Sequence, residues 1–174
     1  MPFSLLPWRK FRRLTDVRPD FLLRNGISFL MLDLDNTISP YGDSVPGEDV
    51  LRWADDMREK GVTLCIVSNN KTDRPVRFAG MMGIASFGRA RKPRRNGILA
   101  ALEAAGKKPD ESALAGDQIY TDVLAANLCG AFPILVQPVR LEKPLHIARY
   151  VLEIPFRREK RRIIGKEQTD GIHR

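Results

Sequence analysis

The sequence contains few cysteines and no long hydrophobic run. Its two cysteines, Cys65 and Cys129, lie in apolar contexts without metal-ligand spacing, so neither a zinc site nor a disulfide framework is predicted. No apolar stretch approaches the roughly 20 residues that a membrane-spanning helix needs. The apolar residues 3–8 precede the first basic cluster, which is the reverse of a signal peptide. We therefore expect a cytoplasmic protein, either soluble or peripheral at the inner face of the membrane.

Acidic residues are scarce at both ends of the chain. The formal net charge is +8; residues 1–24 hold six Lys/Arg against two acids, and residues 140–174 hold ten against five. Residues 25–139 are close to neutral. The length of 174 residues suits one compact domain. We therefore divide the chain into a basic amphipathic segment (1–24), a domain (25–139) and a basic C-terminal segment (140–174).

Apolar runs alternate with helical patterns along the central part of the chain. Strands are predicted over 29–32, 63–67, 84–87, 112–115 and 132–136. Helices are predicted over 50–60, 74–82, 94–105 and 120–128. This alternation predicts an α/β fold with a parallel sheet and right-handed crossovers.

Two carboxylates follow the first of these strands, because Asp33 and Asp35 come directly after residues 29–32. In an open parallel sheet, ligands bind in the crevice outside the carboxyl ends of the strands. One carboxylate there can attack phosphorus, a second can protonate a leaving oxygen, and both can hold Mg2+. An ordinary aspartate-rich turn would give the same short pattern.

Three later segments carry polar residues after apolar runs or before a helix. Ser68 and Asn69 follow the strand 63–67, Lys92 precedes the helix 94–105, and Asp117 and Asp122 follow the strand 112–115. Each has an ordinary explanation, as a helix cap, a surface lysine or a turn. Their order along the chain is more specific than any one of them.

The ordered set resembles the four motifs of the haloacid dehalogenase phosphatase superfamily. The strings around Asp33, Ser68, Lys92 and Asp117 look like the YqeG-type branch of its subfamily IIIA. Eukaryotic relatives of that branch include the mitochondrial phosphatidylglycerophosphate phosphatases. The resemblance covers residues 14–139 and implies a doubly wound, Rossmann-like parallel sheet.

The resemblance also implies a Mg2+-dependent phosphoric monoester hydrolase. Asp33 would attack phosphorus to form an aspartyl-phosphate, while Asp35 would act as acid and then as base. The implied roles of the wider set are metal binding by Asp33, Asp35 (through its backbone carbonyl) and Asp117, phosphate binding by Ser68, Asn69 and Lys92, and support by Thr37 and Asp122.

No stretch between the motifs is long enough to hold an inserted cap domain, neither 38–49 nor 69–91. Caps in this superfamily close over small substrates, so a capless crevice favours a bulky phosphorylated substrate such as phosphatidylglycerophosphate. Closure by a second copy in a homo-oligomer is the other interpretation.

The two basic ends leave several partners open. Residues 3–13 and 149–164 mix apolar side chains with cations, although Pro155 interrupts any helix in the second segment. They are interpreted either as binding an anionic membrane surface or as packing on the domain. Nucleic acid is less favoured because no RNA-recognition motif accompanies them. The alternative to an enzyme is a non-catalytic phosphate-recognition or RNA/ribosome-associated module, against which the paired Asp33 and Asp35 argue.

Overall fold

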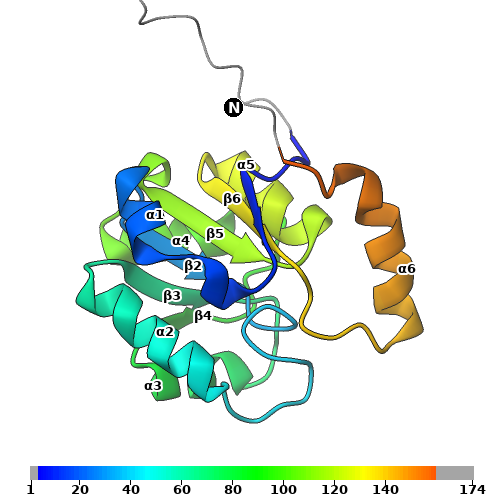
Figure 1. The fold of residues 1–174 in the computed structure, drawn as a ribbon, viewed down its shortest axis with the longest axis horizontal. Helices are drawn as coiled ribbons and strands as arrows, with labels where there is room; N and C mark the ends of the chain where they lie inside the picture. The colour runs from blue at the N-terminus through cyan, green and yellow to red at the C-terminus, as the bar shows by residue number, and fades with distance from the viewer. Residues whose placement is uncertain (1–3, 160–174) are drawn as a thin grey trace, which may run out of the picture.

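A single parallel sheet organises the computed structural model, which describes residues 4–159 (Figure 1). Its six strands lie in the order β1-β6-β5-β2-β3-β4, and every neighbouring pair is parallel. Their bounds are β1 Arg9–Phe11, β2 Phe29–Leu32, β3 Thr63–Val67, β4 Ala85–Phe87, β5 Ser112–Gly116 and β6 Phe132–Val136. The predicted α/β fold with a doubly wound parallel sheet is confirmed.

Helices cover both faces of the sheet. The first face carries α1 (Pro19–Arg24), α2 (Glu48–Glu59) and α3 (Arg74–Met82), whereas α4 (Asn96–Ala105) and α5 (Leu124–Cys129) cover the other. Short turns are η1 (Leu14–Asp16), η2 (Pro109–Glu111), the π-type turn η3 (Ile119–Val123) and η4 (Ile154–Phe156). The last helix, α6 (Pro144–Glu153), follows a long loop after β6 and lies to one side of the sheet (Figure 1).

Alternation along the central strands builds the two apolar layers. In β2, Leu30 and Leu32 join the cluster under α2 and α3, while Phe29 and Met31 join the cluster under α4 and α5. Successive strand residues point to opposite faces, so a strand buried on both sides is apolar throughout. All four residues of β2 are buried, as this requires.

The N-terminal segment differs from the expected division of the chain. We expected the domain to begin at residue 25, but β1 pairs in parallel with β6 through Arg9 and Ile134. Trp8 and Phe11 contact Phe21, Phe11 in an edge-to-face arrangement, and both pack on the first core cluster. The sequence did not predict β1 because it is short, rich in cations and pairs with a strand more than a hundred residues later.

The remaining elements are close to the prediction. The helix expected over 120–128 begins as the π-type turn η3 and continues as α5, and α4 begins two residues later than expected. The last helix, α6, was not predicted; its second half overlaps the basic amphipathic segment 149–164, of which residues 160–164 lie outside the described residues. Within 4–159, no helix has the length and apolarity needed to cross a bilayer.

The strand order places a crevice between β2 and β5. The chain moves from β2 to β3 and β4 in one direction, and from β5 to β6 in the other. Such a reversal opens a space at the carboxyl ends of the two central strands. The first and last predicted motifs follow these two strands.

Candidate active site

Three carboxylates meet in the crevice between β2 and β5. Asp33 follows β2 directly, Asp117 follows β5, and Asp122 lies in η3. All three are buried, and each offers an oxygen within 4.8 Å of the others. Gly116 permits this approach, because a Cβ at that position would collide with the Asp122 side chain. The structure therefore brings Asp33, Asp117 and Asp122 together at one edge of the sheet.

Lys92 is the cation at the centre of this cluster. Its Nζ lies 2.7 Å from Asp33 Oδ1 and 2.7 Å from Asp122 Oδ1, and the side chain is buried. Burial alone would lower the pKa of Lys92, but the charges of Asp122 and Asp33 outweigh it and raise the pKa above its ordinary value. Lys92 is therefore held as a positive charge between Asp33 and Asp122.

Asp117 is left with an unsatisfied carboxylate oxygen. Its Oδ1 is buried and has no hydrogen-bond partner among residues 4–159. Burial raises the pKa of Asp117 well above its ordinary value, and the neighbouring charges of Asp33 and Asp122 add to this effect. A hard divalent cation would satisfy this oxygen and offset the repulsion among the acids. The donor set, all carboxylate oxygens, fits Mg2+.

Asp35 is held outside this cluster by two side chains that the sequence reasoning did not assign. Arg74 Nη1 forms an ion pair with Asp35 Oδ1, and Asn70 Nδ2 donates to Asp35 Oδ2 at 3.0 Å. Arg74 also donates to the backbone carbonyls of Pro40 at 2.8 Å and Asp43 at 3.0 Å. It therefore fixes both the Asp35 carboxylate and the loop beyond it.

Arg74 gave only a weak signal in the sequence. It begins the predicted helix 74–82, where a basic residue in the first turn opposes the helix dipole and suggests a reason outside the helix. Its side chain is buried and packs over the Phe78 ring, with 4.6 Å between the guanidinium carbon and the ring centroid. A buried arginine needs a charged partner, and only the tertiary structure identifies it as Asp35.

Ser68 and Asn69 follow β3 on the neighbouring side of the crevice. Ser68 is buried, and its Oγ accepts a hydrogen bond from the Asn70 backbone at 3.1 Å, which leaves the hydroxyl proton for donation. Asn69 binds the Lys92 backbone twice, donating to the carbonyl at 2.9 Å and accepting from the N–H at 2.6 Å. The Asn69 side chain thus holds the Lys92 segment in place.

The loop that carries the two aspartates is fixed at both sides. Thr37 Oγ1 donates to Asp33 Oδ2 at 3.3 Å, as its expected supporting role requires. Asn36 adopts a left-handed conformation with φ of 67°, which asparagine tolerates better than most residues. Its side chain binds the Arg140 backbone, donating to the carbonyl at 2.6 Å and accepting from the N–H at 3.2 Å.

The C-terminal segment also reaches the site. Arg157 is buried, donates to the Asp117 carbonyl at 2.9 Å and pairs with Glu153 at 3.0 Å. His146 of α6 stacks on Tyr41, with 4.5 Å between ring centroids. Burial raises the pKa of Tyr41, and a hydrogen bond from Arg149 partly opposes this. At least part of the basic C-terminal segment therefore packs on the domain.

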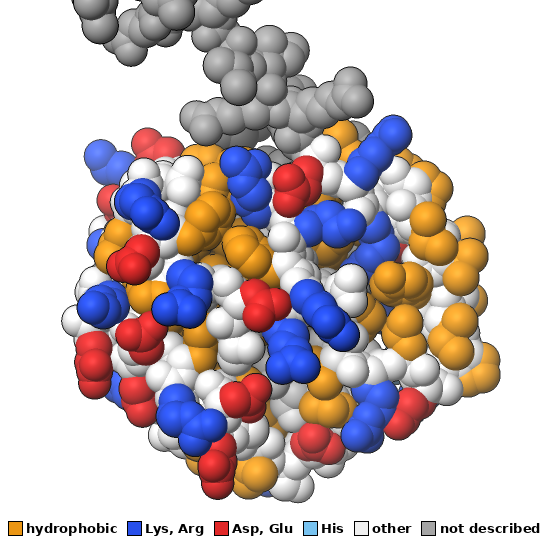
Figure 2. Space-filling view, viewed as in Figure 1, with side chains coloured by type: hydrophobic (Ala, Val, Ile, Leu, Met, Phe, Trp, Pro, Cys, Tyr) orange, Lys and Arg blue, Asp and Glu red, His pale blue; other side chains and the backbone are white. Residues whose placement is uncertain are grey.

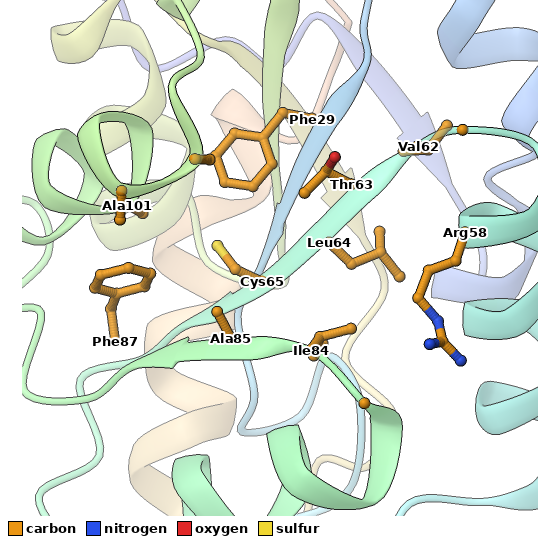
Figure 3. Close-up of a pocket in the computed structure, with 14 residues that line it drawn as sticks. Phe29, Arg58, Val62, Thr63, Leu64, Cys65, Ile84, Ala85, Phe87 and Ala101 are labelled. Carbon is orange, nitrogen blue, oxygen red and sulfur yellow. The ribbon is translucent and has the colours of Figure 1, made fainter.

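A separate hollow lies between β3, β4 and α4 (Figure 3). Its volume is about 470 Å³, and Phe29, Cys65, Phe87 and Ala101 surround it. None of its lining residues is acidic, and burial raises the pKa of Cys65 to about 12, so the thiol stays protonated. This hollow therefore lacks the groups that the chemistry at Asp33 would need.

Comparisons with known proteins agree with this geometry. A family model described as haloacid dehalogenase-like hydrolase matches residues 14–130. The chain is 31% identical over 134 residues to the probable phosphatase YqeG of Bacillus subtilis (strain 168), covering 77% of this chain and 78% of that protein.

Solved structures show the same fold at lower identity. An uncharacterised protein from Listeria monocytogenes serotype 4b aligns with a TM-score of 0.55 and 15% identity, covering 68% of this chain and 84% of that one. The cobalt-bound deoxy-D-mannose-octulosonate 8-phosphate phosphatase YrbI of Haemophilus influenzae aligns with a TM-score of 0.53 and 18% identity, covering 64% and 70%.

Proposed function

We propose that this chain, which belongs to the haloacid dehalogenase-like hydrolases, works through an aspartyl-phosphate formed on Asp33. It is a YqeG-type phosphatase and therefore a phosphoric monoester hydrolase. The observation that carries the proposal is the contact of Asp33 with Lys92 in a buried crevice at the carboxyl end of β2. A carboxylate fixed beside a permanent cation is available as a nucleophile while the charge of an incoming phosphate is offset.

The first half of the reaction transfers the phosphoryl group to the protein. Asp33 attacks phosphorus as the bond to the leaving oxygen breaks, and Asp35, in its protonated form, donates the proton to that oxygen and becomes a carboxylate. Lys92 and the Ser68 hydroxyl hold the phosphoryl oxygens. In the second half, Asp35 takes a proton from water as this water attacks phosphorus, which releases phosphate and restores Asp33.

Mg2+ is the cofactor that we propose for this site. Asp33 and Asp117 would hold it through their carboxylates and Asp35 through its backbone carbonyl, with Asp122 in support. Bound there, the ion would offset the charge of the carboxylates and of the phosphoryl oxygens. The partnerless Oδ1 of Asp117 supports this assignment.

A bulky phosphorylated substrate is the class that the open site favours. Residues 38–47 form a loop without helix or strand between the aspartates and α2, so they contribute no cap. Without a lid, the reacting phosphate can be presented by a molecule larger than the crevice. We propose a lipid phosphate such as phosphatidylglycerophosphate.

A phosphate-release panel tests the substrate. With Mg2+ present, we expect turnover of a generic aryl phosphate and a higher kcat/KM for phosphatidylglycerophosphate in mixed micelles than for sugar phosphates, nucleotides or a phosphopeptide. The measurement is inorganic phosphate released per unit time at equal substrate concentration. A higher kcat/KM for any of those soluble compounds would reject the lipid, and no turnover of any compound would reject the mechanism.

Arg74 offers a test of the acid that protonates the leaving group. Replacing it by methionine removes the ion pair to Asp35 and keeps much of the side-chain volume. Without Arg74 the Asp35 side chain is no longer held in position to protonate the leaving oxygen. We therefore expect kcat for an alkyl phosphate to fall by about 10²-fold, because general acid catalysis contributes roughly that much or more. An aryl phosphate with a low-pKa leaving group should lose far less, because its leaving oxygen needs no proton.

The matched control is Arg77→Met on the same helix. Arg77 is half exposed and pairs only with Asp73, at 3.2 Å, in the described structure. The Arg77→Met variant should have the wild-type kcat for both the alkyl and the aryl phosphate. Equal losses for the alkyl and aryl substrates in Arg74→Met would assign Arg74 to holding the loop or the phosphate, and not to positioning Asp35.

A further inference from the structure

Helix α6 presents an apolar face to solvent. Counting its own residues and those of η4, five large aliphatic side chains are between 43% and 77% exposed: Leu145, Ile147, Val151, Leu152 and Ile154. At 100° per residue, they share one side of the helix with Pro144, Ala148 and Pro155. Figure 2 shows apolar side chains gathered over this part of the molecule. A surface helix normally turns its apolar side toward the core instead.

The opposite face of α6 is polar and is fixed on the active site. Glu153 is 1% exposed, accepts from the Tyr120 backbone at 3.4 Å and pairs with Arg157. His146 stacks on Tyr41, and Arg157 donates to the Asp117 carbonyl. These contacts set which side of the helix faces outward. The exposed apolar face therefore follows from specific polar contacts and not from loose packing.

Cations flank the apolar face at both ends. Arg140 and Lys143 precede the helix, and Arg158 follows it, all three exposed. Glu142 and Glu159 are the exposed acids beside them. Over the whole segment 140–174 the sequence carries ten Lys/Arg against five acids. Although Arg140 pairs with Glu142 at 3.3 Å, the segment as a whole is positively charged, and an aliphatic face in such a segment is complementary to an anionic lipid surface, which offers acyl chains and acidic head groups together.

We propose that the outer face of α6 docks the protein on an anionic lipid bilayer. The aliphatic side chains enter the head-group region, and the flanking cations contact lipid phosphates. A protein partner is less well matched, because the exposed large side chains are aliphatic and lack the Trp and Tyr that dominate protein interfaces. The polar side of α6 contacts Tyr41 and the Asp117 carbonyl, so the docked helix would hold the phosphatase at the membrane with the crevice on the inner side of α6; the link to catalysis rests on the proposed function.

Vesicle co-sedimentation of the full chain tests the docking independently of catalysis. The probes are vesicles of phosphatidylcholine alone and vesicles in which about one third of the lipid is the anionic phosphatidylglycerol. We expect binding to the anionic vesicles, weaker binding to phosphatidylcholine alone, and a loss of binding toward 1 M salt, where the Debye length is about 3 Å.

The decisive variant is Leu145→Gln with Leu152→Gln, whose side chains are 77% and 67% exposed. Each leucine that no longer enters the bilayer weakens partitioning, so we expect binding to fall by about tenfold or more. The control is Val76→Gln with Met81→Gln, two exposed apolar residues of α3. Control and wild type should bind alike. Both variants should retain the wild-type rate on a soluble aryl phosphate and the wild-type thermal unfolding midpoint.

Each contrary result overturns the proposal. The proposal is wrong if the wild-type protein does not bind anionic vesicles. It is also wrong if the Leu145/Leu152 variant binds them as well as wild type does, because α6 would then not be the membrane-binding surface. Light scattering gives the oligomeric state. If the wild-type protein is a dimer and binds no vesicles, and the Leu145/Leu152 variant is a monomer, the apolar face contacts a second copy of the chain. A wild-type protein that does not turn over the aryl phosphate would instead refute the proposed function. That result leaves the docking proposal standing, because vesicle binding does not depend on turnover.

Discussion

We expect Asp33→Asn to lower the rate of phosphate release by at least about 10⁴-fold while the protein stays folded. The amide keeps the shape of the carboxylate, but it carries no charge and is a poor nucleophile toward phosphorus. Lys92 retains its second partner, because its Nζ also lies 2.7 Å from Asp122 Oδ1. The central cation therefore stays paired although the reaction cannot begin.

The measurement is kcat on an aryl phosphate, together with the thermal unfolding midpoint. Asp110→Asn is the matched control, because Asp110 is an exposed aspartate in η2, at the amino end of β5, whereas the site lies at the carboxyl ends of the strands. Its kcat should equal that of wild type. An Asp33→Asn protein that turns over substrate at the wild-type rate would exclude an aspartyl-phosphate on this residue.

Removal of divalent cations should have the second largest effect. We expect EDTA to lower turnover by about 10³-fold and added Mg2+ to restore it, because a Lewis acid contributes several kcal/mol to stabilising the reacting charge. In the described structure one lysine pairs with two of the three clustered carboxylates, Asp33 and Asp122, so a phosphate entering the crevice adds to an excess of negative charge. A cation removes that repulsion.

Binding of Mg2+ can be measured without turnover. An ion that binds only the folded protein raises the unfolding free energy, by about 2.7 kcal/mol at a hundred times its Kd. Wild type should therefore unfold at higher temperature with Mg2+ than with EDTA, and Asp117→Asn should lose most of this shift. Full activity in EDTA, or an equal shift in Asp117→Asn, would contradict a metal site at these carboxylates.

The membrane surface on α6 and the catalytic crevice lie on opposite faces of one helix. Its polar side contacts Tyr41 and the Asp117 loop, whereas its aliphatic side faces solvent. If both proposals hold, the C-terminal segment keeps the phosphatase at the membrane surface, where lipid phosphates are concentrated. The chemistry itself would remain that of the residues after β2, β3 and β5.

The sequence by itself determined five of the six described strands and the candidate catalytic groups. Runs such as 29–32 are apolar throughout because strands buried on both faces need it, and this pattern is local. Asp33, Ser68 and Asp117 each follow such a run, so the parallel arrangement brings them to one edge without any further information. Those features depend on residues that are neighbours in the chain.

Only the tertiary structure decided which distant side chains support the site. Arg74 pairs with Asp35 across 39 positions, Arg157 reaches Asp117 across 40, and β1 joins β6 across more than a hundred. In a chain with 29 Lys and Arg, composition cannot distinguish a buried, paired arginine from a solvated one. Likewise, the apolar residues of α6 suggested packing or a membrane, and the buried pair of Glu153 and Arg157 decided which face points outward. Charge pairs between residues far apart in the chain leave no periodic pattern in the sequence, because the fold alone decides which charged side chains meet.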